Sequence, residues 1–380
     1  MSLSEIKVLV KRIGQGLLAF VFIYYLFILV LKPGAISLFK QLFVKRDPPN
    51  TIYGLLDPLK FVEKTISGEN IEYELNTKSG GLPTNIPDRI PVYKFKPKPF
   101  NYLAGKEAKE DAEKLGFKES DLISDLKGNI YKWKNIRTGG QLEIDINKKD
   151  LVMKTDLLTK SASFTKGNIN WGGAKEYAQS LLRSLGRFDD LYNSGVSTVY
   201  LGKITQSDIE ETVISEEAQI AKVDFFRSIN KYKVVGPDPK KGLLSLYVRK
   251  PENDLLLNAP IIEAYYNGIN PDSSASYPII SPAEAWQAVR SGLGVVTNAT
   301  PRNFNHFKNY SPVRVEKILI DSIYIGYYET PEYQTFLQPI YVFEGKYTTR
   351  GSEGGSIAIY FPAILREYTK QIEENNNLNQ

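Results

Sequence analysis

The sequence contains a single histidine, His306, and no cysteine. Serine and cysteine hydrolases need a nucleophile activated by a nearby base, most often histidine. His306 lies in the motif Phe304-Asn-His306-Phe, where a packing or surface role is the simplest interpretation. The lack of cysteine excludes disulfides, thiolate nucleophiles, cysteine zinc sites and iron–sulfur clusters.

Two further motifs match catalytic patterns only in part. Ser163 and Lys166 have the spacing of the serine–lysine pair of penicillin-recognising enzymes, but the K-T-G and S-D-N companion motifs are absent. The segment Gly351-Ser-Glu-Gly-Gly355 lacks the lysine and spacing of a phosphate-binding loop and predicts a hairpin turn or loop. We therefore predict no catalytic, cofactor-binding or metal-binding residue.

Carboxylates offer the remaining route to catalysis. A pair held roughly 5 to 10 Å apart cleaves glycosidic bonds, and Asp189 with Asp190 or Glu216 with Glu217 are candidates by residue type. Sequence alone does not bring two of them to that separation, so solvated residues are the default expectation. A cell-wall hydrolase or modifying enzyme is the alternative function.

Composition indicates an ordinary globular protein. Of the 380 residues, 42% are hydrophobic and 24% are charged. The net charge of +5 is spread along the chain without a basic block, so no nucleic-acid partner is predicted.

Any site must be positioned by the secondary-structure elements of the chain. The first predicted segments are a cytoplasmic tail at 1–12 and a transmembrane helix at 13–32. Residues 13–31 carry no charge, and about 20 apolar residues span the hydrocarbon core. A secretory signal peptide is the competing interpretation, but its apolar region would be shorter and followed by a cleavage site. The predicted anchor contacts membrane lipid.

Basic residues lie on both sides of this helix, so the positive-inside count is nearly balanced. We favour a cytoplasmic N-terminus in a single-pass cell-membrane protein, because long domains translocate regardless of charge. Residues 33–47 form an amphipathic pattern that predicts an interfacial helix or, equally, a helix docked on the following domain.

The remaining chain repeats a short helix followed by alternating strands. Module one spans residues 48–160. Apolar and charged residues alternate at 71–75 and at 93–96, which predicts two paired strands. A helix that ends near Gly116 is predicted to follow. Residues 131–134 and 142–146 then predict a hairpin, extended by a strand at 151–157.

Module two, 165–280, opens with a helix that carries Ala174, Ala178 and Leu182 on one face. Module three, 281–366, opens with Ser281-Pro-Ala-Glu284, a capping box with proline at the first helical position. Residues 367–380 predict a flexible tail. The predicted fold class is α+β, with about three modules of a helix packed on an antiparallel sheet.

Module three is rich in aromatic residues, for which sheet packing is favoured over stacking on a sugar or peptide. These residues are Tyr324, Tyr327, Tyr328, Tyr333, Phe336 and Tyr341.

Several segments after the predicted anchor resemble a group of uncharacterised single-pass membrane proteins from candidate-phyla bacteria. The segments are Tyr53-Gly-Leu-Leu-Asp-Pro-Leu-Lys-Phe61, Ala112-Glu-Lys-Leu-Gly-Phe117, Val223-Asp-Phe-Phe-Arg227, Ser281-Pro-Ala-Glu-Ala-Trp286 and Gln338-Pro-Ile-Tyr-Val-Phe-Glu-Gly345. Asp57 stands where that group usually has proline. The resemblance implies a bacterial envelope location and no activity.

Module three also resembles the YycH/YycI and PepSY type of extracytoplasmic domain. The resemblance lies in Ala285 and Trp286 on the helix, in Gly326-Tyr-Tyr328, in the strand from Pro339 to Phe343 and in Tyr360-Phe-Pro-Ala363. It implies binding and regulation of membrane partners or proteases.

The sequence therefore predicts a membrane-anchored, envelope-facing binding or regulatory protein without catalysis, whose partner is an envelope protein or wall polymer. The anchor would raise the effective concentration of the outer portion beside other membrane components. A structural protein that associates through Tyr24 and Tyr25 is a further alternative.

Overall fold

A computed structural model describes residue 24 and residues 50–98, 101–127, 129–159, 164 and 167–371, without the side chains of 124–127. The predicted tail 1–12, the interfacial segment 33–47 and residues 372–380 lie outside this range, as does the predicted membrane helix 13–32 apart from Tyr24. Among the helices that are described, none is long and apolar enough to cross a membrane.

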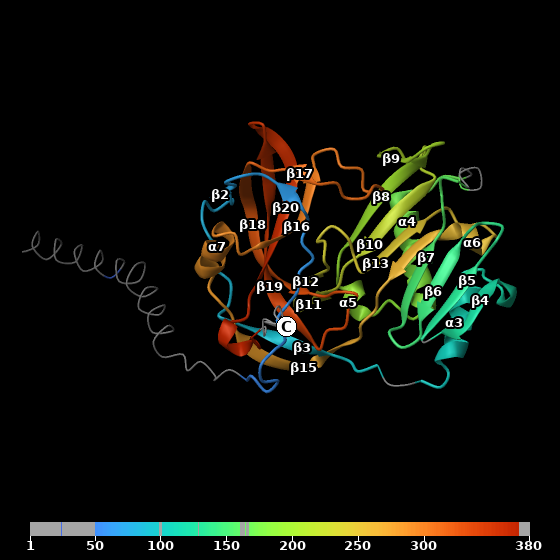
Figure 1. The fold of residues 1–380 in the computed structure, drawn as a ribbon, viewed down its shortest axis with the longest axis horizontal. Helices are drawn as coiled ribbons and strands as arrows, with labels where there is room; N and C mark the ends of the chain where they lie inside the picture. Colours follow the sequence, from blue (N-terminus) through green and yellow to red (C-terminus); the bar gives the residue numbers. More distant parts are fainter. Residues whose placement is uncertain are drawn as a thin grey trace, which may run out of the picture. The chain divides into compact units, whose positions relative to one another are not determined.

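Two large, mostly antiparallel sheets and few helices make the fold α+β, as predicted (Figure 1). The first sheet is antiparallel throughout. Its strands are, in spatial order, β4 (Leu122–Lys127), β5 (Ile130–Lys134), β6 (Gln141–Asp145), β7 (Asp150–Lys154), β14 (Ile261–Ala264), β13 (Leu244–Val248), β10 (Ile220–Phe225), β8 (Ser197–Ile204) and β9 (Ile209–Thr212).

This first sheet contains the predicted repeat in duplicate. Helix α3 (Ala104–Lys114) precedes β4, β5, β6 and β7, and helix α4 (Trp171–Ser184) precedes β8, β10, β13 and β14. The two sets meet through their last strands, because β7 pairs with β14. Ala108 and Ala178 pack in one core with the sheet residues Leu142 and Leu246. The two helices therefore cover the same face of the sheet.

The second sheet is built around the long strands of the C-terminal region. Its main path runs β11 (Ser228–Ile229), β12 (Tyr232–Val235), β18 (Lys317–Tyr328), β19 (Phe336–Thr349), β20 (Ser352–Pro362) and β16 (Val295–Pro301). β2 (Glu72–Leu75) pairs parallel to β18, while β3 (Arg89–Phe95) pairs with β15 (Ile269–Pro278) and with β19. A separate pair joins β1 (Ile66–Ser67) to β17 (Val313–Arg314).

The expectation of one sheet per module is wrong. Strands from 48–160 and 165–280 share the first sheet, and strands from all three predicted modules enter the second. The pairing expected between 71–75 and 93–96 is also absent from the described strands, since β2 pairs with β18 and β3 with β15 and β19. The hairpin of β5 and β6, extended by β7, is confirmed.

The predicted start of the helix in module three is confirmed at atomic detail. Helix α7 (Pro282–Arg290) begins at a capping box in which the Glu284 amide donates to Ser281 Oγ (3.2 Å) and the Ser281 amide donates to Glu284 Oε2 (2.8 Å). Trp286 of α7 stacks on Phe343 of β19, with ring centroids 6.1 Å apart. Helix α4 begins at Asn170, whose side chain accepts from the Gly173 amide.

The remaining helical segments are short. They are the 3₁₀ turn Glu119–Asp121 between α3 and β4, α5 (Asp190–Asn193) between α4 and β8, α6 (Leu255–Asn258) between β13 and β14, and the 3₁₀ turn Arg366–Tyr368 after β20.

Candidate functional site

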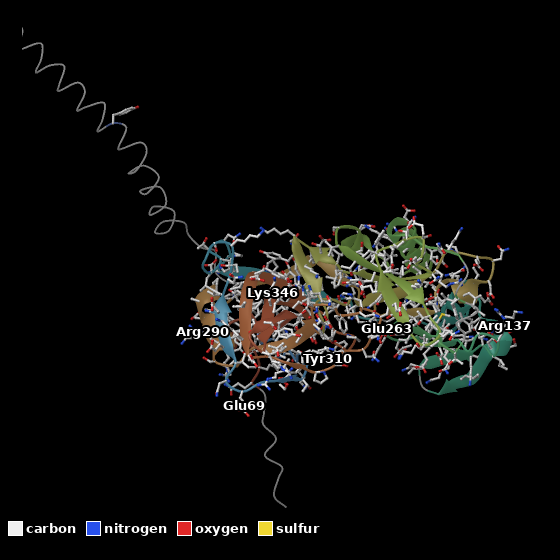
Figure 2. All side chains as sticks on the ribbon, turned by 90° about the horizontal axis from the view of Figure 1, so that it is seen from above. Glu69, Arg137, Glu263, Arg290, Tyr310 and Lys346 are labelled. Atoms are coloured by element: carbon white, nitrogen blue, oxygen red, sulfur yellow. The ribbon has the colours of Figure 1, made fainter. Side chains whose placement is uncertain are left out.

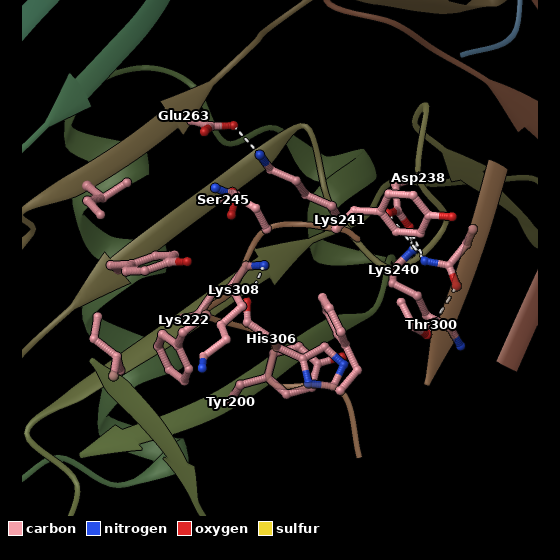
Figure 3. Close-up of a pocket in the computed structure, with 18 of the residues that line it drawn as sticks. Tyr200, Lys222, Asp238, Lys240, Lys241, Ser245, Glu263, Thr300, His306 and Lys308 are labelled. Atoms are coloured by element: carbon pink, nitrogen blue, oxygen red, sulfur yellow. Dashed lines mark hydrogen bonds and ion pairs between the residues drawn. The ribbon is translucent and has the colours of Figure 1, made fainter. Parts of the chain in front are cut away.

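The face of the first sheet opposite to α3 and α4 is polar where it meets a large cleft. Because side chains alternate along a strand, Val223, Leu246 and Ile262 pack in the core with the helices. Their neighbours Lys222, Tyr247 and Glu263 line the cleft, whose volume is about 750 Å³ (Figure 3).

Cross-strand register arranges the floor of the cleft in two rows. Lys222 pairs with Tyr200 on β8 and with Tyr247 on β13. In the next row, Asp224 pairs with Ser245, which pairs with Glu263 on β14. Neighbouring strands therefore present lysine, tyrosine and carboxyl groups side by side.

Elements of the second sheet form the opposite wall. Asn298 and Thr300 of β16, Ser356 of β20 and the connection after β16 line the cleft. Figure 2 shows Tyr310 and Glu263 in the middle of the described part, between Arg290 and Arg137 at its two ends. The cleft thus lies between the two sheets.

Positive charge dominates the lining. Three carboxylates, Asp156, Asp238 and Glu263, face six lysines and one arginine. The cations are Lys64, Lys154, Lys222, Lys240, Lys241, Lys308 and Arg302. Charges of one sign gathered in a cleft raise the local concentration of oppositely charged ligands.

Each of the three lining carboxylates already has a protein partner. Asn298 donates to both oxygens of Asp238 (3.1 and 3.3 Å), Lys241 pairs with Glu263, and the Thr159 hydroxyl donates to Asp156. By contrast, no carboxylate among the described residues pairs with the exposed side chains of Lys154, Lys240 or Arg302.

Asp224 is buried directly behind these cleft-lining groups. One oxygen accepts from the Gly242 amide (3.1 Å), while Oδ2 has no hydrogen-bond partner in the described structure and lies 3.8 Å from Lys222 Nζ. Burial raises the pKa of the Asp224 carboxyl, and the charge of Lys222 opposes that shift.

Residues 302–310, which we call the clasp, connect β16 to β17 and reach across to the first sheet (Figure 1). Asn305 Nδ2 donates to the Ile209 carbonyl (2.7 Å), and Lys308 pairs with Asp208 at 2.6 Å. Phe307 packs on a cluster that includes Ile204, Ile209 and Ile220. The clasp therefore ties β16 to β8 and β9 beside the cleft.

The single histidine belongs to this clasp. The His306 ring stacks on Tyr200, with centroids 3.7 Å apart and an interplanar angle of 11°, and its Nδ1 lies 2.9 Å from Glu211 Oε2. Lys222 donates to the His306 carbonyl (3.1 Å). The packing role expected for His306 is thus what the contacts show.

A buried ionic cluster joins the two sheets away from the cleft. Arg227, between β10 and β11, lies 3.5 Å from Glu329 at the end of β18 and 3.9 Å from Asp189. Its guanidinium stacks over the rings of Tyr192 and Tyr266. Because these residues come from both sheets, the cluster holds one sheet against the other.

The carboxylates considered from sequence do not gather in the cleft. Asp189 caps α5, Asp190 accepts from Asn193, and Glu217 pairs with Lys203 at 3.2 Å. Glu216 accepts from Asn168 only through its backbone carbonyl. None of the four lines the cleft. Ser163 and Lys166 lie outside the described residues.

Two other expectations are settled by the packing. The Gly351 segment is the predicted hairpin turn, because Thr349 of β19 pairs with Ser352 of β20 and Arg350 and Gly351 both have positive φ. Tyr327, Tyr328 and Tyr341 are fully buried in the second sheet, as predicted for sheet packing, but the prediction is wrong for Tyr333, which lies between β18 and β19 and is 84% exposed. In the part of the chain that is described, no group of three or more Asp, Glu or His side chains is placed to hold a metal ion.

Sequence reasoning missed the cationic residues of the cleft. The pair Lys240-Lys241 beside Gly236-Pro-Asp-Pro239 was a usable local signal. The other cations are scattered over the sequence and converge only through long-range strand pairing.

Comparison with known proteins adds little. No protein-family model matches the sequence, and no curated protein matches it significantly. One similar solved structure is that of an uncharacterised protein from Eubacterium rectale ATCC 33656. It is 11% identical over 72% of this chain and 83% of that chain, with a TM-score of 0.42. A likeness at this level supports no statement about fold or function.

Proposed function

We propose that this chain is a non-catalytic binding protein, anchored by one N-terminal membrane helix, that holds an envelope protein or wall polymer in the basic cleft. The single observation that carries the proposal is the cleft of about 750 Å³, where six lysines and one arginine face three carboxylates. The uncharged segment 13–31 supports the anchor, with the N-terminus cytoplasmic and residues 50–371 extracytoplasmic.

The state of the carboxylates favours binding over hydrolysis. Glycoside cleavage needs one carboxyl group as acid and a second as base or nucleophile. Asp156, Asp238 and Glu263 are each held by a protein donor, so a freely available pair is not presented to a ligand. Asp224 is fully buried behind the lining.

Photo-crosslinking in native membranes tests this proposal. A photoreactive amino acid is placed at Asn309, an exposed residue of the cleft, and in a second variant at Lys175, an exposed residue of α4. We expect envelope protein or wall polymer to be captured from position 309 and not from position 175. Equal capture from both positions, or none from 309, contradicts the proposal.

A turnover assay with the purified full-length chain distinguishes the binding protein from the alternative, a cell-wall hydrolase or modifying enzyme. Release of soluble fragments from isolated cell wall would support the hydrolase and overturn the binding interpretation. If the chain is a binding protein, the wall material stays intact while it retains the protein.

A further inference from the structure

We infer that the ligand of the cleft is a phosphodiester polymer, a chain of sugar or polyol units joined by phosphate groups. This inference deepens the proposed function and rests on it, because it names the class of molecule that the cleft takes.

The cations available to a ligand come from separate elements. Lys154 ends β7, Lys240 lies in the loop after β12, and Arg302 opens the clasp. All three are exposed, and no carboxylate of the described chain pairs with them. Three exposed cations on three separate elements can each contact a different charge of a chain that carries repeated negative charges. The arrangement therefore favours an anionic polymer.

The aromatic rings of the cleft are already engaged by other groups. His306 stacks on Tyr200 at 3.7 Å, Phe307 packs edge-on against Tyr247 at 5.4 Å, and Lys64 Nζ lies 5.2 Å from the Tyr310 ring. Binding of single-stranded nucleic acid relies on free aromatic faces on which bases stack. The occupied rings therefore argue against a ligand that carries planar bases.

The lining cations are mostly lysines. The planar fork of arginine matches a carboxylate or a phosphate in two parallel hydrogen bonds, whereas the lysine ammonium binds phosphate as a point charge that tolerates many orientations. The cleft has one arginine and six lysines. Such a lining suits tetrahedral phosphates presented at varying angles along a flexible chain.

Hydroxyl and amide groups between the cations suit the units that join the phosphates. Ser245, Thr300 and Ser356 line the cleft, and burial raises the pKa of Tyr200 to about 12, so that its phenol stays neutral. Thr300 and Ser356 bond each other (2.8 Å), and because a hydroxyl has one donor and two acceptor positions, each retains capacity for a further bond to a hydroxyl of a sugar or polyol.

Titration of the full-length chain in neutral detergent micelles with poly(glycerol phosphate) tests the inference. We expect saturable binding that weakens steeply between about 50 and 200 mM salt, because bound phosphates release counterions. Lys154→Glu and Lys240→Glu should each weaken binding about tenfold or more, equivalent to about 1.4 kcal/mol. Lys175→Glu on α4 makes the same charge change on the helix-covered side of the sheet and should leave the affinity unchanged.

Three competitor ligands define the outcomes that would overturn the inference. The first is polygalacturonate, a carboxylate polymer; the second is single-stranded DNA with the same number of phosphates; the third is a vesicle rich in anionic phospholipid. Each should bind at least tenfold more weakly than poly(glycerol phosphate), about 1.4 kcal/mol. Equal or tighter binding of any of them contradicts the assignment, as does poly(glycerol phosphate) binding that survives both cleft substitutions.

The inference and the proposed function fail in different ways. If position 309 captures a protein or a neutral glycan in membranes, and the purified chain does not bind poly(glycerol phosphate), the cleft is a binding site for another ligand. If position 309 captures nothing, the proposed function itself falls.

Discussion

Arg227 and Glu329 form a buried ion pair between the two sheets: Nη1 of the arginine lies 3.5 Å from Oε1 of the glutamate, and each residue is 1% exposed. Arg227 Nη1 also donates to the Asn267 carbonyl (2.6 Å), while its Nε and Nη2 have no hydrogen-bond partner among the described residues. Burial raises the pKa of Glu329, and the charge of Arg227 opposes that shift.

Replacing the arginine should therefore be costly. In Arg227→Met the Glu329 carboxylate loses its counter-charge in a buried site, and we expect about 3 kcal/mol of unfolding free energy to be lost. The double variant Arg227→Met/Glu329→Leu removes both charges and should recover most of that loss. Urea denaturation measures both, with Arg290→Met on the exposed end of α7 as the control. A single variant as stable as the wild type would show that the pair does not hold the sheets together.

The clasp depends on Phe307, which packs against Ile204, Ile209 and Ile220. A side chain at Gly202 of β8 would lie 2.7 Å from Phe307 Cζ, so the glycine leaves room for the docked ring. Phe307→Ala should lower the free energy of local opening by about 2 kcal/mol, because the ring is only half-buried. Amide exchange of residues 302–310 should then be roughly thirtyfold faster.

Phe304→Ala is the matched control for the clasp, because Phe304 lies in the same loop and contacts His306 edge-on. Exchange elsewhere in the first sheet should be unchanged in both variants. If Phe304→Ala opens the clasp as much as Phe307→Ala does, docking of Phe307 is not what holds it.

Local sequence signals predicted the elements well. The Ser281 capping box, the Ala174–Ala178–Leu182 stripe and the hairpin of β5 and β6 each depend on neighbours within a few residues. The α+β class followed from these signals. The pairing between distant strands could not be predicted from these signals. The alternation of apolar and polar residues along a strand shows which side chains share a face, but it does not show which strand lies beside it.

The cleft could not be predicted for the same reason. Lys222 and Glu263 come together only because β10, β13 and β14 are neighbours, and Lys308 joins them only because the clasp crosses from the second sheet. Each lysine is unremarkable in its own segment. Asp189 and Asp190 were conspicuous as a pair in sequence, yet the first caps α5 and the second bonds to Asn193.

Asp150 at the start of β7 makes stability depend on pH. Burial raises its pKa to about 6, and the charge of Lys98 opposes that shift. Between the ordinary pKa of about 4 and the raised value, the folded protein holds a proton that the unfolded chain has released. The unfolding free energy should therefore fall as pH rises from about 4 to 6.

Asp150→Asn isolates this contribution, since asparagine does not titrate. We expect the variant to lose the part of the pH slope due to Asp150 and to be more stable than the wild type above pH 6, by about 1 kcal/mol after allowance for solvent screening. Denaturant midpoints at several pH values measure the difference. Parallel curves for the two proteins would contradict the assignment of the slope to Asp150.

Glu263 and Lys241 form an ion pair in the cleft, and breaking it should strengthen binding of an anionic polymer. Glu263→Gln removes a negative charge from the floor and frees Lys241, so the affinity for poly(glycerol phosphate) should rise about threefold at low salt and the gain should vanish as salt screens the cleft. A gain of affinity cannot arise from misfolding, which makes this variant more informative than a loss. Glu110→Gln on α3, where Glu110 pairs with Lys106 at 3.7 Å, makes the same charge change on the helix-covered side and should have no effect. If both variants gain equally, binding follows the net charge of the protein and not the cleft.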